Sequence, residues 1–273
     1  MKHLNDVVVL LGAGAIGLEI VKRVATNKTI FLGDINQDNL SRAKEGLENA
    51  GFTVETAIVD GGDRHAIQAF ADQAEKLGNI TSYIHTAGLF PNQAAFEDIL
   101  RVDLVGTAIA LEIFGKLVAP GGAGLVVSSM AGHMFADTVT VEQRMALATT
   151  SADDLGTLDF MKEDIPGGAY AISKQGNILR VQAESLNWAK RGARLNSISP
   201  GIIITPLARH ELQANPEGYQ ALIDNSATKR VGTTAEVATA GAYLLSEEAS
   251  FITGTDLLID GGVIAAMKNG KMG

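Results

Sequence analysis

Short apolar runs rich in β-branched residues recur along this chain, separated by longer stretches with helical spacing of apolar residues. The runs are Val7 to Leu11, Thr29 to Leu32, Thr53 to Val59, Ile80 to His85, Gly124 to Val127, Arg194 to Ile198 and Leu257 to Ile259. Such alternation is typical of parallel strands whose connecting helices cover both faces of a sheet. The sequence therefore predicts a single α/β domain over residues 1–273, with a doubly wound parallel sheet of about seven strands.

The intervening stretches predict six main helices. They are Leu18 to Ala25, Gln37 to Ala50, Arg64 to Leu77, Phe96 to Val118, Ala169 to Ala189 and Ala235 to Leu245. Four of them are followed by a glycine, namely Gly51, Gly78, Gly121 and Gly192. Glycine is common just after a helix because it adopts a left-handed backbone conformation without steric cost, so we expect the helices to stop there.

Residues 133–168, called the insert below, depart from this alternation. The insert is acidic: it contains Asp137, Glu142, Asp153, Asp154, Asp159, Glu163 and Asp164 against only Arg144 and Lys162. Thr140 with Gln143, and Ser151 with Asp154, have the spacing of helix N-terminal caps and predict two short helices. Because this composition offers little apolar area to bury, we expect the insert to be more mobile than the sheet.

Composition excludes several function classes. A net charge of −9 without a basic patch argues against nucleic acid as a partner. The absence of cysteine excludes a disulfide framework, a thiolate nucleophile and a Cys-ligated metal, and we predict no metal site. No apolar stretch reaches the length of a membrane span. Asp6 precedes the first apolar run and glycines interrupt the residues after it, which argues against a signal peptide and favours a cytoplasmic location.

The first run continues directly into Gly12-Ala13-Gly14-Ala15-Ile16-Gly17, and an apolar helical pattern comes next. A G-x-G-x-x-G between a strand and a helix is typical of dinucleotide binding, because the glycines let the backbone approach a pyrophosphate at the helix N-terminus. We therefore predict that Gly12, Gly14, Ile16 and Gly17 bind a cofactor. The alternative is a structural glycine turn between packed elements.

Asp34 ends the second run about 20 residues beyond this loop, where a carboxylate can accept hydrogen bonds from the adenosine ribose hydroxyls. A 2′-phosphate would need a nearby cation, but Ile35 and Asn36 follow Asp34, and the loop holds no Lys or Arg. The predicted cofactor is therefore NAD. A role for Asp34 as a cap of the following helix is an alternative that is compatible with cofactor binding.

Tyr170 and Lys174 open the longest helical pattern, and their i, i+4 spacing puts the phenol and the ammonium on one face. A phenol has a reference pKa near 10, so it is a poor acid or base at neutral pH unless a cation stabilises its anion. Lys174 can supply that cation.

Several motifs together resemble the short-chain dehydrogenase/reductase family over essentially the whole chain. They are the Gly12 loop, Asp60, Thr86-Ala87-Gly88, Ser128-Ser129, Tyr170 with Lys174, Ser199-Pro200-Gly201, Gly254-Thr255-Asp256 and Asp260-Gly261-Gly262. The resemblance implies a Rossmann-type fold, a homodimer or homotetramer, and an NAD-dependent oxidoreductase. Its reaction would transfer a hydride between the nicotinamide and a secondary alcohol or ketone.

The resemblance also implies roles for single residues. Ser129, rather than Ser128, would hydrogen-bond the substrate oxygen, Tyr170 would exchange its proton, and Lys174 would hold the nicotinamide ribose and lower the pKa of the tyrosine. Asp60 would contact adenine, and further cofactor contacts would come from Ala87, Gly88, Pro200, Ile203 and Thr205. For either serine, an ordinary turn hydrogen bond at the end of a strand is the alternative.

Three positions depart from the family pattern. The family's commonest loop is G-x-x-x-G-x-G, so the loop contacts transfer only approximately. Asp103 stands where the family usually has an asparagine of a proton relay, and an ionised carboxylate can accept from a relay water but cannot donate as an amide does. His85 stands where an asparagine is usual, and we interpret it as a hydrogen-bonded strand-end residue rather than a catalyst.

The insert lengthens the chain between Ser129 and Tyr170, where some bacterial hydroxysteroid dehydrogenases and carbonyl reductases that the chain resembles also carry helical insertions. It is either a lid over the substrate or an interface or solvated elaboration. Met130 and His133 either face the substrate or pack at the base of the insert. Leu89, Phe90, the insert and residues 207–219 would select the substrate, which the sequence does not name.

Two other function classes are open. An NAD-retaining epimerase or dehydratase resembles a branch of the same family but usually needs a larger C-terminal substrate domain. A non-catalytic nucleotide-sensing protein would keep the fold without the chemistry. The presence of Ser129, Tyr170 and Lys174 disfavours the sensor, whereas Asp103 leaves it open.

Overall fold

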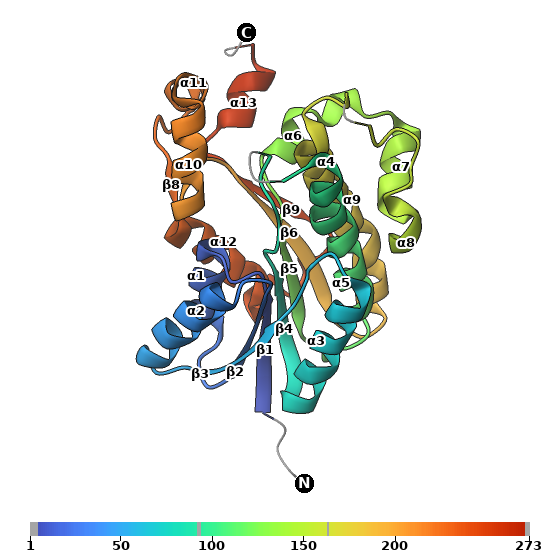
Figure 1. Ribbon diagram of the computed structural model, residues 1–273, viewed down its shortest axis with the longest axis vertical. Helices are drawn as coiled ribbons and strands as arrows, with labels where there is room; N and C mark the ends of the chain where they lie inside the picture. Colours follow the sequence, from blue (N-terminus) through green and yellow to red (C-terminus); the bar gives the residue numbers. More distant parts are fainter. Residues whose placement is uncertain (1–4, 92–93, 163, 271–273) are drawn as a thin grey trace.

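The computed structural model describes residues 5–91, 94–162 and 164–270, and its centre is a parallel sheet in the order β3-β2-β1-β4-β5-β6-β9 (Figure 1). Its strands are β1 (Asn5–Leu11), β2 (Thr29–Asp34), β3 (Thr53–Ile58), β4 (Gly78–His85), β5 (Ala123–Val127), β6 (Arg194–Pro200) and β9 (Asp256–Ile259). All seven predicted strands are confirmed, with ends within two residues of the expected positions.

Helices cover both faces of this sheet, as predicted (Figure 1). One layer holds α1 (Ala15–Val24), α2 (Gln37–Asn49) and α12 (Thr234–Leu245), and the other holds α3 (Arg64–Leu77), α5 (Thr107–Phe114) and α9 (Gly168–Ala189). Strand β1 shows why its run is continuously apolar. Val7, Val9 and Leu11 are buried in one core and Val8 and Leu10 in the other, since successive side chains of a strand point to opposite faces.

The strand order reverses between β1 and β4, and the connections after these two strands meet at this point. The backbone N–H groups of Thr86 and Ala87 both donate to the carbonyl of Leu11, at 2.8 and 2.9 Å. In open parallel sheets the crevice at such a reversal, outside the carboxyl ends of the strands, is where ligands bind. The fold thus brings the glycine loop and the Thr86-Ala87-Gly88 turn to the usual ligand position.

The helix predicted over Phe96 to Val118 is wrong as a single continuous helix. It consists of α4 (Phe96–Ile99), a π-helical segment η1 (Leu100–Gly106) and α5, which ends at Phe114, well before Gly121. Within η1, the backbone carbonyl of Asp103 accepts a 2.7 Å hydrogen bond from the hydroxyl of Thr107. Single π-helical turns inside helices often mark functional sites, and this one carries Asp103.

Several short elements that follow β6 in the chain are not predicted from the sequence. They are β7 (Ile203–Ile204), β8 (Gly232–Thr233), α10 (Pro206–Ala214), α11 (Pro216–Asn225), the 3-10 turn η3 (Glu247–Ala249) and α13 (Val263–Lys268). A small apolar cluster of Met130, Ile202, Val263 and Ile264 joins α13 to the start of the insert region.

The insert contains α6 (Ala131–Met134, which begins just before it), the 3-10 turn η2 (Ala136–Thr138), α7 (Val141–Thr149) and α8 (Ala152–Leu155). Both predicted caps are confirmed: Thr140 and Gln143 form a reciprocal capping box, and the Ser151 side chain accepts from the N–H of Asp154. The expectation of little buried apolar area is wrong for α7 and α8. Leu147, Ala152 and Leu155 are fully buried in the core that α5 and α9 share.

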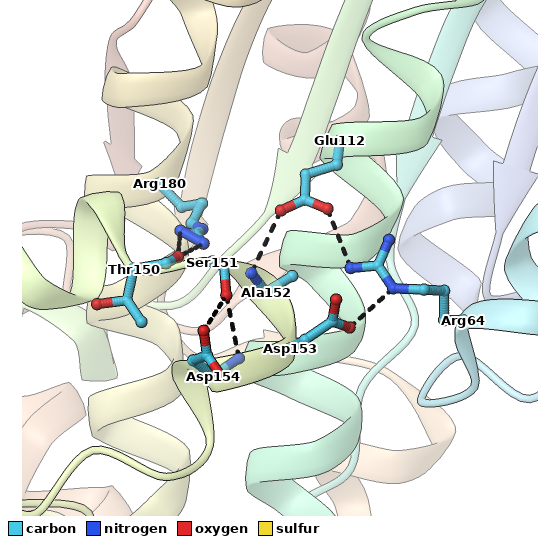
Figure 2. A network of polar contacts seen from close by, with 8 residues as sticks. All are labelled: Arg64, Glu112, Thr150, Ser151, Ala152, Asp153, Asp154 and Arg180. Carbon is cyan, nitrogen blue, oxygen red and sulfur yellow. Dashed lines mark hydrogen bonds and ion pairs between the residues drawn. The ribbon is translucent and has the colours of Figure 1, made fainter.

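A polar network attaches this part of the insert to the body of the protein (Figure 2). Arg64 of α3 pairs with Glu112 of α5 at 3.0 Å and with Asp153 of α8 at 2.8 Å, and Glu112 accepts from the N–H of Ala152. On the other side, the guanidinium of Arg180 on α9 donates to the carbonyls of Ala148 and Thr150. Arg180 is only 3% exposed, and burial lowers its pKa from the ordinary arginine value.

We expect Arg180→Ala to lower the free energy of unfolding by about 2 kcal/mol or more, because it leaves the carbonyls of Ala148 and Thr150 without their buried donor. Arg64→Ala is the matched control. Its ion pairs are partly exposed and should contribute less than about 1 kcal/mol. Urea unfolding measures the two losses of stability, provided that the slope of free energy against urea is the same in both variants. An equal or larger loss in Arg64→Ala would contradict the expectation.

Candidate active site

The turn after β1 requires its first glycine. Gly12 has a φ of +95°, and a Cβ atom there would collide with the backbone nitrogen of Ala87. A Cβ on Gly17 would lie 2.8 Å from both Leu10 Cδ1 and Thr86 Oγ1, so this glycine lets α1 pack closely on β1. Gly12 and Gly17 therefore let the loop and α1 pack closely against β1 and the Thr86-Ala87-Gly88 turn.

Gly14 shows that the loop also fits a ligand. It is the N-cap of α1 but supplies no side chain, and the space around its Cβ position is open to 4 Å. The first N–H groups of α1 therefore have no side-chain cap, and a helix N-terminus with free N–H groups attracts anions such as phosphate. Ile16 is partly buried against the core behind the loop. The residues present thus fit the pyrophosphate of a dinucleotide.

Asp34 is linked to this loop rather than to the helix that follows it. Its carboxylate accepts from the N–H of Ala13 at 2.8 Å and from the N–H of Asn36 at 2.9 Å. The cap of α2 is Asn36, whose side chain accepts from Asp38 and Asn39, so the alternative of Asp34 as that cap is wrong. An ionised carboxylate has further lone pairs, which leaves Asp34 able to accept from ribose hydroxyls.

Asp60 lies two residues beyond β3 and has a partner that sequence reasoning missed. Both of its carboxylate oxygens are 3.0 Å from Nη1 of Arg101, and the N–H of Gly62 also donates to it. Arg101 belongs to η1, two residues before Asp103. A basic residue in a stretch that also holds Glu97, Asp98 and Asp103 is the available signal, but its partner cannot be read from local sequence.

Tyr170 and Lys174 lie on the first two turns of α9, as the i, i+4 spacing predicted. Nζ of Lys174 is 5.2 Å from the centroid of the Tyr170 ring, and the ring of Phe90 stacks on Tyr170 at 5.4 Å between centroids. Lys174 is buried, whereas Tyr170 is partly exposed. Tyr170 is therefore partly exposed, stacked on an aromatic neighbour, and close to a cation.

Asp103 is the direct partner of Lys174. Its Oδ2 is 2.9 Å from Nζ of Lys174, its Oδ1 accepts from the N–H of Leu89 at 2.7 Å, and its side chain is fully buried. Burial alone would lower the pKa of Lys174, but the charges of Asp103 and Tyr170 outweigh burial and raise it above the ordinary lysine value. A Cβ on Gly88 would lie 2.9 Å from Asp103 Oδ2, so the glycine turn packs directly on this pair.

The two serines after β5 have different surroundings. The hydroxyl of Ser128 is buried and donates to the backbone carbonyl of Lys174 at 2.7 Å, which ties β5 to α9. Ser129 is partly exposed, and its oxygen accepts from the N–H of Ala131 at 3.2 Å. Ser129 is thus the serine whose hydroxyl proton is available to a substrate, which favours it over Ser128 for that role.

His85 is hydrogen-bonded on both ring nitrogens and buried, as expected of a strand-end residue. Since the hydroxyl of Thr107 donates to the carbonyl of Asp103, it accepts from Nε2–H of His85, and Nδ1 then accepts from the hydroxyl of Tyr83. Burial, with the charge of Lys174, lowers the pKa of His85 to about 3, so the ring is neutral. This chain of hydrogen bonds fixes the backbone of η1 beneath the site.

His133 and Met130 are held at the base of the insert. Nε2 of His133 is 2.8 Å from Oδ2 of Asp256, whose other oxygen accepts from the hydroxyls of Ser197 and Ser199. Met130 is buried in the small cluster with α13. Both contacts favour the packing alternative over a substrate-facing role.

The remaining predicted cofactor residues lie at the end of β6 and after it. Pro200 ends this strand, and its carbonyl accepts from the N–H of Met130. Ile203 is buried on β7 and borders a cavity of about 170 Å³ together with Asp260. The hydroxyl of Thr205 accepts from the N–H of Ala208 and so supports the start of α10.

Two family models match this chain. The model described as short chain dehydrogenase matches residues 6–141, and the model described as Enoyl-(Acyl carrier protein) reductase matches residues 164–264. Between them they cover the glycine loop and Asp103 in the first part, and Tyr170 with Lys174 in the second.

Similar proteins match over nearly the full length. The chain is 41% identical to the short-chain dehydrogenase/reductase bsc3 of Alternaria brassicicola, over 96% of both proteins. It is 29% identical to a galactitol 2-dehydrogenase (L-tagatose-forming) of Cereibacter sphaeroides, over 92% of each.

Solved structures show the same fold. A 7α-hydroxysteroid dehydrogenase complexed with NADH and 7-oxo glycochenodeoxycholic acid is 22% identical, with a TM-score of 0.75 over 95% of both chains. An actinorhodin polyketide ketoreductase with NADPH is 20% identical, with a TM-score of 0.74 over 95% of this chain and 97% of that one.

Proposed function

Because this chain belongs to the short-chain dehydrogenase/reductase family of nicotinamide-dependent oxidoreductases, we propose that it transfers a hydride between NAD(H) and a secondary alcohol or ketone. Tyr170 is the general acid and base, Lys174 supports its charge, and Ser129 orients the substrate oxygen. The observation that carries the proposal is the closeness of Lys174 Nζ to the Tyr170 ring, 5.2 Å from its centroid, on the helix that packs beside the Gly88 turn.

The chain's own residues manage the proton. When bound, the nicotinamide ring gives or accepts the hydride. In ketone reduction the hydroxyl of Tyr170 gives its proton to the substrate oxygen, and in alcohol oxidation the phenolate takes the hydroxyl proton. Ser129 donates a hydrogen bond to that oxygen and fixes its place. Lys174 stabilises the phenolate between the two steps.

Different residues along the carboxyl edge of the sheet would bind different parts of the cofactor. The loop of Gly12, Gly14, Ile16 and Gly17 would hold the pyrophosphate and Asp34 the adenosine ribose. Asp60 would lie at the adenine, whereas Ala87, Gly88, Pro200, Ile203 and Thr205 would line the path to the nicotinamide. The domain would span residues 1–273 and work as a cytoplasmic homo-oligomer. No helix in the described part of the chain is long and apolar enough to cross a membrane.

A screen tests this function. The purified chain is incubated with NADH and a panel of ketones, and with NAD and a panel of secondary alcohols that includes linear polyols, while NADH absorbance is followed. We expect turnover with at least one pair well above that of the Tyr170→Phe variant. Equal background rates for parent and variant across the whole panel would contradict the proposal.

Hydrogen exchange distinguishes the two alternatives for the insert, a lid or an interface, because a lid predicts uneven exchange within it. In the ligand-free protein, amides of α7 and α8 should exchange slowly because Leu147 and Leu155 anchor these helices in the core. The described turns between Thr157 and Pro166 have mostly single-turn backbone hydrogen bonds and should exchange faster. Protection of those turns equal to that of β1 in an isolated subunit would reject a lid, and protection only in an oligomer would favour an interface.

A further inference from the structure

The pair formed by Asp103 and Lys174 differs from what a neutral amide at position 103 would give. An asparagine could accept a hydrogen bond from the lysine, but it would leave the ammonium as a single positive charge beside Tyr170. Here a fully buried carboxylate lies 2.9 Å from Nζ of Lys174. Seen from Tyr170, the cation is therefore coupled to a nearby anion.

The surroundings hold this pair in place. Oδ1 of Asp103 is anchored by the N–H of Leu89, and the absence of a side chain at Gly88 lets the turn approach both charged groups. The hydroxyl of Thr107 donates to the backbone carbonyl of Asp103, and neutral His85 in turn donates to Thr107. The N–H of Leu89 thus holds the carboxylate of Asp103, and Thr107 holds its backbone.

We propose that Asp103 is a positioning residue for the function proposed above, on which this inference rests: it holds Lys174 by a direct ion pair and offsets part of the support that Lys174 gives to the Tyr170 phenolate. The consequence is that Tyr170 stays protonated to a higher pH than it would beside an unpaired lysine. The protonated phenol is the form that gives a proton to a ketone oxygen, so the pair favours the acid role of Tyr170.

The charged and titratable groups around this site are few. In the part of the chain that the structure describes, the groups that face Lys174 are Asp103 from η1, Tyr170 from α9 and His85 from β4. His85 is neutral at ordinary pH, because its pKa is about 3. Asp103 is therefore the group whose removal changes the charge near Tyr170 while the Lys174 side chain stays in place.

The test is a titration of tyrosinate absorbance in the ligand-free protein, which needs neither substrate nor cofactor. The signal of Tyr170 is the difference between each protein and the same protein carrying Tyr170→Phe. We expect Asp103→Asn to lower the pKa of Tyr170 by about one unit, since a nearby charge typically shifts a pKa by that amount or more. Asp72→Asn on the exposed face of α3 is the matched control, which removes an equal charge far from the pair and should leave the titration unchanged.

Each outcome decides the inference. An unchanged or higher pKa of Tyr170 in Asp103→Asn would overturn it, as would the same downward shift in the control. Asp103→Ser is the second variant, should the first not fold, and loss of the fold in both would also overturn it by showing that the pair serves the fold alone. Once a substrate is found, the pH at half-maximal oxidation rate should move down with the titration. Absence of turnover in the parent would count against the proposed function and leave the titration result intact.

Discussion

Tyr170→Phe is expected to lower kcat by about 10³-fold, close to background, because general acid and base catalysis typically contributes 10²- to 10⁴-fold. The substitution removes only the hydroxyl. The ring keeps its stacking on Phe90 and its place beside Lys174, so α9 and the neighbouring turn should be undisturbed. A 10³-fold loss corresponds to about 4 kcal/mol of transition-state stabilisation, more than an ordinary hydrogen bond contributes.

The affinity for NAD(H) should change by no more than a few fold in this variant, and fluorescence titration of bound NADH can measure it. Tyr243→Phe on α12 is the matched control, because this tyrosine is 43% exposed and lies on the opposite layer of the sheet. Activity of Tyr170→Phe within a few fold of the parent would rule out Tyr170 as the proton donor. A parallel collapse of NADH binding would instead assign the residue a structural role.

The sheet could be predicted because its signal is local. In β1 every residue from Val7 to Leu11 is buried, so the strand reads as a continuous apolar run whatever its partners are. The caps of α7 and α8 are local too, since Thr140 and Ser151 bind N–H groups within three residues of themselves. Elements whose signal comes from neighbours in sequence, such as this strand and these caps, are therefore found where the sequence predicts them.

The interruption of the predicted helix over Phe96 to Val118 could not be seen in this way. A π-helical turn shifts the apolar face by one residue, and in a segment where Leu100, Val102, Leu104 and Ile109 are all buried the shift leaves no gap in the pattern. A contact distant in sequence accompanies this turn: Thr107 binds the backbone carbonyl of Asp103, and His85 of β4 is hydrogen-bonded to Thr107. The order of motifs indicates position 103, but it does not indicate the ion pair of Asp103 with Lys174.

The burial of the insert is not visible in its sequence for a related reason. Its composition is acidic, but the few apolar residues on α7 and α8 meet a surface that α5 and α9 supply, and those helices are distant in sequence. Likewise Arg101 binds Asp60 from 41 residues away. Buried area and ion pairs of this kind are set by packing, so composition alone gave the wrong expectation.

A preference for NAD over NADP of about a hundredfold in kcat/KM is expected, which corresponds to about 3 kcal/mol. The reason is the position of Asp34. Two backbone hydrogen bonds, from Ala13 and Asn36, fix its carboxylate against the glycine loop, so it cannot swing away from a group that enters there. A 2′-phosphate would bring nearly two negative charges toward that carboxylate and would replace a ribose hydroxyl that donates to it.

Two variants separate these causes. Asp34→Asn keeps the side-chain shape and one acceptor oxygen but removes the charge, so it should relieve the repulsion and reduce the preference about tenfold, mainly through better use of NADP. Asp34→Ser also removes the acceptor for the N–H of Ala13, so it should reduce the preference and weaken NAD use as well. Measuring kcat/KM with both cofactors in all three proteins decides the question. Equal use of the cofactors by the parent, or the same ratio in all three proteins, would show that Asp34 only braces the glycine loop.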